Sequence, residues 1–66
     1  MDPKYPKVKV KLVGEDGNAF SILGRVILAL KRAKVEASEL DAFKAEATAG
    51  DYDHLLATVS KWVNVS

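Results

Sequence analysis

The residues best suited to chemistry form one short run, Asp51-Tyr52-Asp53-His54, which holds the only histidine of this 66-residue chain. General acid–base catalysis needs a histidine that a second side chain holds in place, and a metal ion needs three or more ligands. The sequence has no second histidine and no cysteine. The start of a helix explains the same residues, since Asp51 suits an N-cap and Asp53 suits the positive end of the helix dipole. The sequence therefore predicts no catalytic residue, no metal site and no cofactor, and we expect a protein that is not an enzyme.

Basic side chains are concentrated in the first half of the chain. Residues 1–34 carry eight basic and three acidic side chains, residues 35–66 carry two basic and six acidic ones, and the net charge is +1. Clustered cations favour phosphates, so one interpretation is a face that binds anions or nucleic acid. This candidate face consists of Lys7, Lys9, Lys11, Arg25 and Lys31. The small net charge favours the alternative, a solvated strand face that limits aggregation and a basic helix end that complements the dipole.

A loop rich in glycine, Gly14-Glu15-Asp16-Gly17-Asn18, lies between a predicted strand and a predicted helix, where phosphate-binding loops occur. Its spacing matches neither a dinucleotide-binding fingerprint nor a P-loop nor an EF-hand. Glu15 and Asp16 would also repel a phosphate. We therefore interpret this segment as a turn that leads into a capped helix.

Five elements must position these residues, in the order strand, helix, helix, helix, strand. The run from Lys7 to Leu12 alternates between lysine and apolar residues, which predicts a strand with Val8, Val10 and Leu12 facing a core. Three intervening helices would return the final strand parallel to the first, so that the two pair side by side. The sequence thus predicts one α+β domain over residues 1–66, with a two-stranded sheet packed on helices and residues 1–6 as a flexible or extended arm.

The helix boundaries follow from capping residues. Asn18 is the predicted N-cap of a helix that starts at Ala19, and Asp51 caps the third helix. Ser38 resembles the first residue of a capping box, which would place it at the start of the second helix. Gly50 fits the left-handed position that ends this helix. The third helix is expected to give way to the last strand near Lys61.

The first predicted helix is apolar over a wider arc than two other helices can cover. Ile22, Val26 and Leu28 widen this arc, and a small chain without disulfides or metal often needs a partner to complete its core. We therefore expect a symmetric homodimer, the commonest assembly. The alternative is a monomer in which the helices wrap one face of the strand pair and bury these residues.

Trp62 has two interpretations. Its spacing from Leu55 and Val59 places it on the core face of the third helix. A strand that starts at Lys61 would instead expose Trp62 among the lysines, as part of a binding surface. The candidate interaction surface accordingly consists of Ile22, Val26, Leu28 and Trp62.

The sequence also constrains the compartment. The longest apolar run, from Val26 to Leu30, is far too short to span a membrane, and the N-terminus lacks the apolar region of a signal peptide. Without cysteine there is no disulfide. We expect a cytoplasmic protein that does not bind membranes.

Three motifs carry a resemblance over nearly the whole chain: Val13-Gly14-Glu15-Asp16-Gly17-Asn18-Ala19-Phe20, Ile22-Leu23-Gly24-Arg25-Val26, and Gly50-Asp51-Tyr52-Asp53-His54-Leu55-Leu56 followed by Trp62-Val63. This pattern resembles a family of small uncharacterised bacterial and phage or mobile-element proteins. The resemblance implies no substrate, cofactor or catalytic residue. We expect a small non-enzymatic module for protein interaction or regulation. The alternative is a nucleic-acid-binding accessory protein that uses the Lys/Arg face. Besides a second copy of the chain and nucleic acid, another protein is a possible partner.

Overall fold

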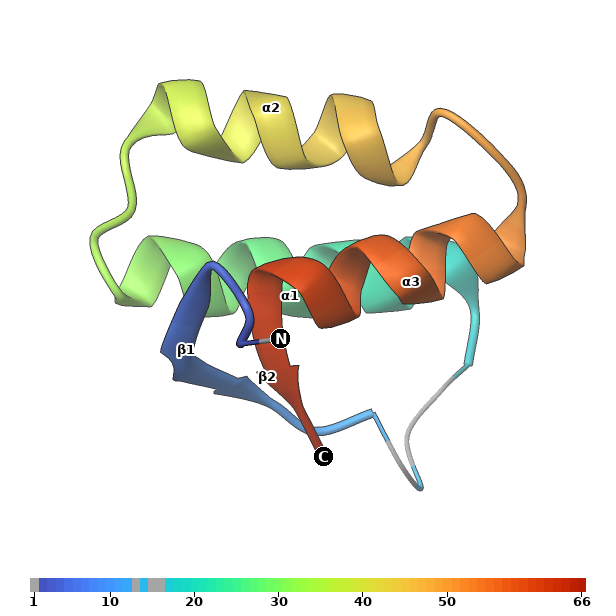
Figure 1. The fold of residues 1–66 in the computed structure, drawn as a ribbon, viewed down its shortest axis with the longest axis horizontal. Helices are drawn as coiled ribbons and strands as arrows, with labels where there is room; N and C mark the ends of the chain where they lie inside the picture. The colour runs from blue at the N-terminus through green and yellow to red at the C-terminus, as the bar shows by residue number, and fades with distance from the viewer. Residues whose placement is uncertain (1, 13, 15–16) are drawn as a thin grey trace.

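Three helices and two short strands follow one another in the predicted order. The computed structural model describes residues 2–12, 14 and 17–66. The elements are β1 (Tyr5–Val10), α1 (Ala19–Arg32), α2 (Ala37–Ala47), α3 (Tyr52–Trp62) and β2 (Val63–Val65). Figure 1 shows α2 above α1 and α3 with its axis nearly aligned with theirs, and with the strand pair on the opposite side of these two helices. The predicted α+β class is thereby confirmed.

The two strands form a parallel pair, as predicted. Tyr5 lies opposite Val63 and Val10 lies opposite Val65, with an irregularity in the register between Tyr5 and Lys9. Pro6, which has no N–H to donate to a ladder, falls within this irregularity.

The first strand begins two residues before the alternating run that predicted it. The backbone N–H of Lys4 donates to the carbonyl oxygen of Lys61, 2.7 Å away, and this bond fixes the chain just before β1. Residues 5–6 consequently belong to the sheet rather than to an N-terminal arm. At the other end, the N–H of Leu12 donates to Ser66 at 2.9 Å, just beyond the last residue of each strand.

The start of α1 is formed as its capping residue predicts. The side chain of Asn18 accepts a hydrogen bond from the N–H of Phe20 at 2.8 Å. The α1 residues that face the interior are Ile22, Val26 and Leu30, spaced by four. The glycine-rich turn predicted before this helix lies partly outside the described residues. Gly14, Gly17 and Asn18 are the described residues of this segment.

Two predicted boundaries of α2 are wrong. The helix starts at Ala37, so Ser38 lies in its first turn rather than at a capping box. Lys34 adopts a left-handed backbone (φ 64°) just after the end of α1, and Glu36, two residues before Ser38, is the N-cap of α2. At the other end Gly50 does not adopt a left-handed conformation, and Thr48 is the C-cap. The cap of α3 is confirmed, since Asp51 accepts from the N–H of His54 at 2.9 Å.

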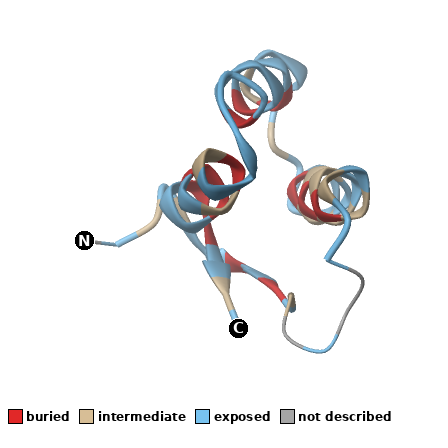
Figure 2. Ribbon diagram, turned by 90° about the vertical axis from the view of Figure 1, so that its right-hand side faces the viewer, coloured by how far each residue is buried: buried red, intermediate tan, exposed pale blue. Residues whose placement is uncertain are grey.

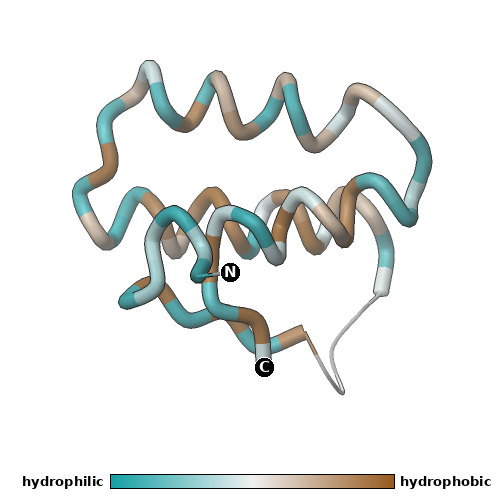
Figure 3. Tube along the Cα trace, viewed as in Figure 1, coloured by the Kyte–Doolittle hydropathy of each residue, from teal (hydrophilic) through white to brown (hydrophobic). Residues whose placement is uncertain are grey.

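The core lies where the three helices meet the inner face of the sheet. Figure 2 shows the buried residues of the helices turned toward this common centre. The largest fully buried side chains come from all three helices and β2, namely Phe43, Leu30, Val26, Val59, Val63 and Thr58. Figure 3 shows polar and apolar residues alternating along the helices, as amphipathic packing requires. Within the described ranges, no helix has both the length and the apolarity to cross a bilayer.

Candidate functional site

Most of the apolar residues that were expected at the surface of α1 are buried. Ile22 and Val26 are 2 % and 0 % exposed, and Trp62 is 6 % exposed, so these three residues belong to the core. Of the predicted interaction surface only Leu28 is exposed, at 49 %. The prediction counted only α2 and α3 as cover, but β1 also packs against α1. Cover from both sides therefore buries Ile22 and Val26 within one chain and leaves Leu28 exposed.

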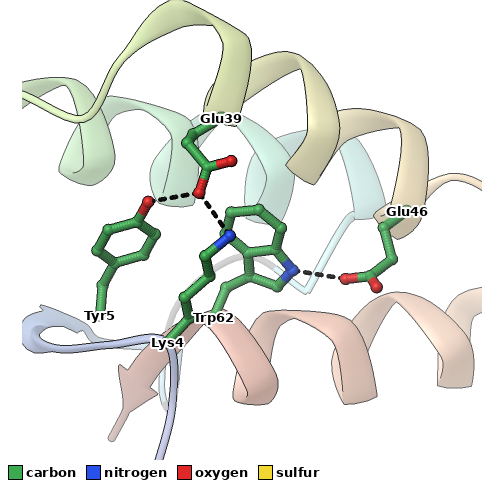
Figure 4. A network of polar contacts seen from close by, with 5 residues as sticks. All are labelled: Lys4, Tyr5, Glu39, Glu46 and Trp62. Carbon is green, nitrogen blue, oxygen red and sulfur yellow. Dashed lines mark hydrogen bonds and ion pairs between the residues drawn. The ribbon is translucent and has the colours of Figure 1, made fainter.

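Trp62 occupies the centre of a cluster that joins β1, α2 and α3 (Figure 4). Its ring lies edge-on to Phe43, with centroids 5.5 Å apart, and tilted against Tyr5 at 6.0 Å. The ammonium group of Lys4 lies 4.4 Å from the ring centroid, a cation–π contact. The indole Nε1–H donates to Glu46 Oε2 at 2.5 Å, which satisfies its only donor. Trp62 is thus a core residue, as its helical spacing indicated.

Glu39 ties the start of β1 to α2 within the same cluster. Its carboxylate accepts a hydrogen bond from the Tyr5 hydroxyl at 2.7 Å and pairs with the Lys4 ammonium at 2.5 Å. The hydrogen bonds from Lys4 and then Tyr5 lower the pKa of Glu39 from its ordinary value. The same carboxylate raises the pKa of Lys4 and of Tyr5, chiefly through these hydrogen bonds. These contacts tie the start of β1 to α2, and the same three side chains border a hollow of about 520 Å³.

His54 has a structural partner of its own. Its Nε2 lies 2.7 Å from the carbonyl oxygen of Glu46, so this nitrogen carries a proton and donates to the last turn of α2. The backbone at position 50 passes close to the His54 side chain, and this approach requires glycine, because a Cβ on residue 50 would lie 2.9 Å from the Cβ of His54. The described residues contain no group of three His, Cys, Asp or Glu side chains placed to hold a metal ion. His54 therefore works as a bridge between α2 and α3.

Most of the predicted basic face is assembled in space. Two adjoining hollows lie between β1 and the second half of α1, of about 370 Å³ and 300 Å³. Both include Lys9 and Arg32, so they form one continuous groove. We call it the basic groove, and its cations are Lys7, Lys9, Lys11, Arg25 and Arg32.

Arg32 takes the place that the sequence gave to Lys31. Seven residues separate Arg25 from Arg32, which is close to two helical turns, so both side chains fall on the α1 face next to β1. Lys31, six residues from Arg25, is exposed and does not line the groove. The groove therefore contains four of the five predicted cations, with Arg32 in addition, and the helical repeat was the signal that could have found Arg32.

A second surface feature was not predicted. Phe20, in the first turn of α1, is 83 % exposed and borders a hollow of about 260 Å³. We call it the Phe20 hollow, and its lining comprises Ala19, Phe20, Leu23, Ala47, Thr48, Gly50, Asp51, Tyr52 and Leu55. The Tyr52 hydroxyl donates to the carbonyl oxygen of Gly17, which fixes the hollow between the start of α1 and the α2–α3 turn. Sequence reasoning missed it because the spacing of Phe20 from Leu23, Ile27 and Leu30 is that of an apolar helix face, whereas α1 buries Ile22, Val26 and Leu30.

Comparison with known proteins gives no match, since no family model, no curated protein and no solved structure matches this chain. The resemblance to small bacterial and phage proteins accordingly stays a prediction.

Proposed function

We propose that this protein is a small non-enzymatic interaction module that associates with a second copy of itself through the Phe20 hollow. The observation that carries the proposal is the 83 % exposure of Phe20 beside a hollow lined mainly by apolar residues. Large aromatic side chains that dominate interfaces are typically anchors that fill a pocket of the partner. Such an anchor is costly to leave in water unless a partner covers it for part of the time.

The arrangement of this surface supports a two-fold dimer. In a symmetric pair the same patch meets itself, so an anchor and its pocket must lie side by side on one chain. Phe20 and the hollow satisfy this requirement, because the ring borders the space that a partner's ring would enter. Among the described residues of the lining, Asp51 is the one that carries a charge, so these residues require little charge to be desolvated.

The expected affinity is modest. Full burial of one Phe contributes about 1.5–3 kcal/mol, and a two-fold dimer buries two. The apolar rim supplied by Leu23 and Tyr52 adds area, while the loss of translational freedom opposes association. We therefore expect dissociation in the micromolar to millimolar range.

Sedimentation equilibrium over that concentration range tests the proposal with Phe20→Ser. We expect a concentration-dependent dimer for the natural chain and a monomer for this variant. Leu28→Ser is the matched control, since Leu28 is also an exposed apolar residue of α1 but lines the basic groove instead. Circular dichroism establishes that both variants fold. A natural chain that stays monomeric, or equal dimerisation of the two variants, would overturn the proposal.

A further inference from the structure

We propose that the basic groove between β1 and α1 binds the phosphate backbone of double-stranded nucleic acid without reading its bases. The inference does not rest on self-association, since the basic groove and the Phe20 hollow share no residue. The ligand class follows from the charge of the basic groove and from the kinds of side chain that line it.

The charge in the two hollows of the basic groove has one sign. No aspartate or glutamate belongs to their lining, as far as the described part of the chain extends. Carboxylates appear in the next hollow, of about 520 Å³, which shares Lys7, Val8 and Ala33 with the basic groove and includes Glu36 and Glu39. The remaining lining residues are aliphatic, namely Val8, Val10, Leu28, Ala29 and Ala33. Five cations around one groove create a positive potential that attracts phosphates and speeds their encounter with the protein.

The spacing of the cations suits a chain of phosphates. Lys7, Lys9 and Lys11 are exposed and alternate with the buried Val8 and Val10, so they project from one face of the chain. At about 3.3 Å per residue this row extends over about 13 Å. The two arginines flank it from α1, which gives a track long enough for several successive phosphates rather than a pocket for one.

The side chains in the groove favour the backbone over the bases. Proteins that hold single strands stack the bases on aromatic rings, and the described lining of the groove contains none. Bidentate amides that read base edges, Asn and Gln, do not line it either. Contacts to phosphate alone carry no sequence information, so we expect binding that is insensitive to sequence.

Fluorescence anisotropy with two labelled duplexes of unrelated sequence tests the proposal, with the matching single strand and polyglutamate as further probes. We expect equal affinity for the two duplexes and weaker binding of the other probes. Five neutralised phosphates would make log K fall with log salt at a slope of about −4.5. No binding at low salt, a tenfold preference for one duplex, or tighter binding of the single strand or polyglutamate would each overturn the proposal.

A matched pair of variants locates the site. Lys9→Gln/Lys11→Gln/Arg32→Gln removes three cations of the groove, and Lys31→Gln/Lys44→Gln/Lys61→Gln removes three exposed cations outside it. Both change the net charge of the chain from +1 to −2. We expect the groove variant to lose at least tenfold in affinity and to reduce the salt slope by about 2.7, the share of three phosphates. Equal losses in the two variants would mean that net charge, not the groove, attracts the duplex.

Discussion

The two ends of β1 use lysine in opposite ways. Lys4, just before the strand, pairs with Glu39 and lies 4.4 Å from the centroid of the Trp62 ring. Lys9 and Lys11, at the other end, line a groove in which the described residues place no carboxylate. A charge with carboxylate and aromatic neighbours contributes to the fold, whereas charges gathered without them destabilise by mutual repulsion. The contrast separates the stabilising cluster of this molecule from the groove for which we propose a ligand.

The largest effect on stability is expected at Trp62, whose ring packs against Tyr5 at the start of β1. Trp62→Ala removes the ring that packs on Phe43 and Tyr5, at a cost of about 3–5 kcal/mol in the free energy of unfolding. A chain of this size has roughly 3–10 kcal/mol in total, so the variant is expected to be partly or fully unfolded. Urea denaturation followed by circular dichroism measures the loss. Trp62→Phe is the control, which keeps an aromatic ring and gives up chiefly the hydrogen bond to Glu46.

A smaller, pH-dependent effect is expected at Glu39. Its pKa is held below the ordinary 4.5 in the folded state, so its contribution to stability is present above pH 4.5 and is lost as the pH falls through the lower, folded value. Glu39→Gln removes this dependence, and the unfolding midpoint should then decline less steeply in acid. Thermal unfolding at a series of pH values checks the slope. An unchanged slope would show that other carboxylates dominate the acid transition.

The smallest effect on stability is expected in the groove. Lys7→Gln, Lys9→Gln and Lys11→Gln each change an exposed side chain, so each should alter the free energy of unfolding by no more than about 0.5 kcal/mol. Urea denaturation of the single variants is the measurement. A loss comparable to that of Trp62→Phe in any of them would remove the contrast between the two ends of β1.

Local sequence patterns were sufficient for most of the fold. The alternation through Val8 and Val10 indicated the inner face of β1, and Asn18 and Asp51 indicated the starts of α1 and α3. These features depend on side-chain period and capping, which involve residues only a few positions apart. The order of the five elements and the parallel pairing of the strands followed from them.

The candidate surfaces depended on contacts that no local pattern contains. Ile22 and Val26 looked available on α1, but β1 packs against the same helix, so both are buried. Phe20 is 83 % exposed, because it precedes the buried Ile22 by two residues, about half a helical turn, and so lies on the opposite side of α1.

The chain by itself determined which residues are charged, which faces are apolar and where helices begin, because these are properties of near neighbours. Only the tertiary structure decided which apolar faces are covered and which cations meet. The helical repeat places Arg25 and Arg32 on one face of α1, and the packing of β1 beside that face makes them part of the groove. Burial and charge convergence are set by the meeting of segments far apart in the sequence, here β1 against α1 and Trp62 against Tyr5 and Phe43.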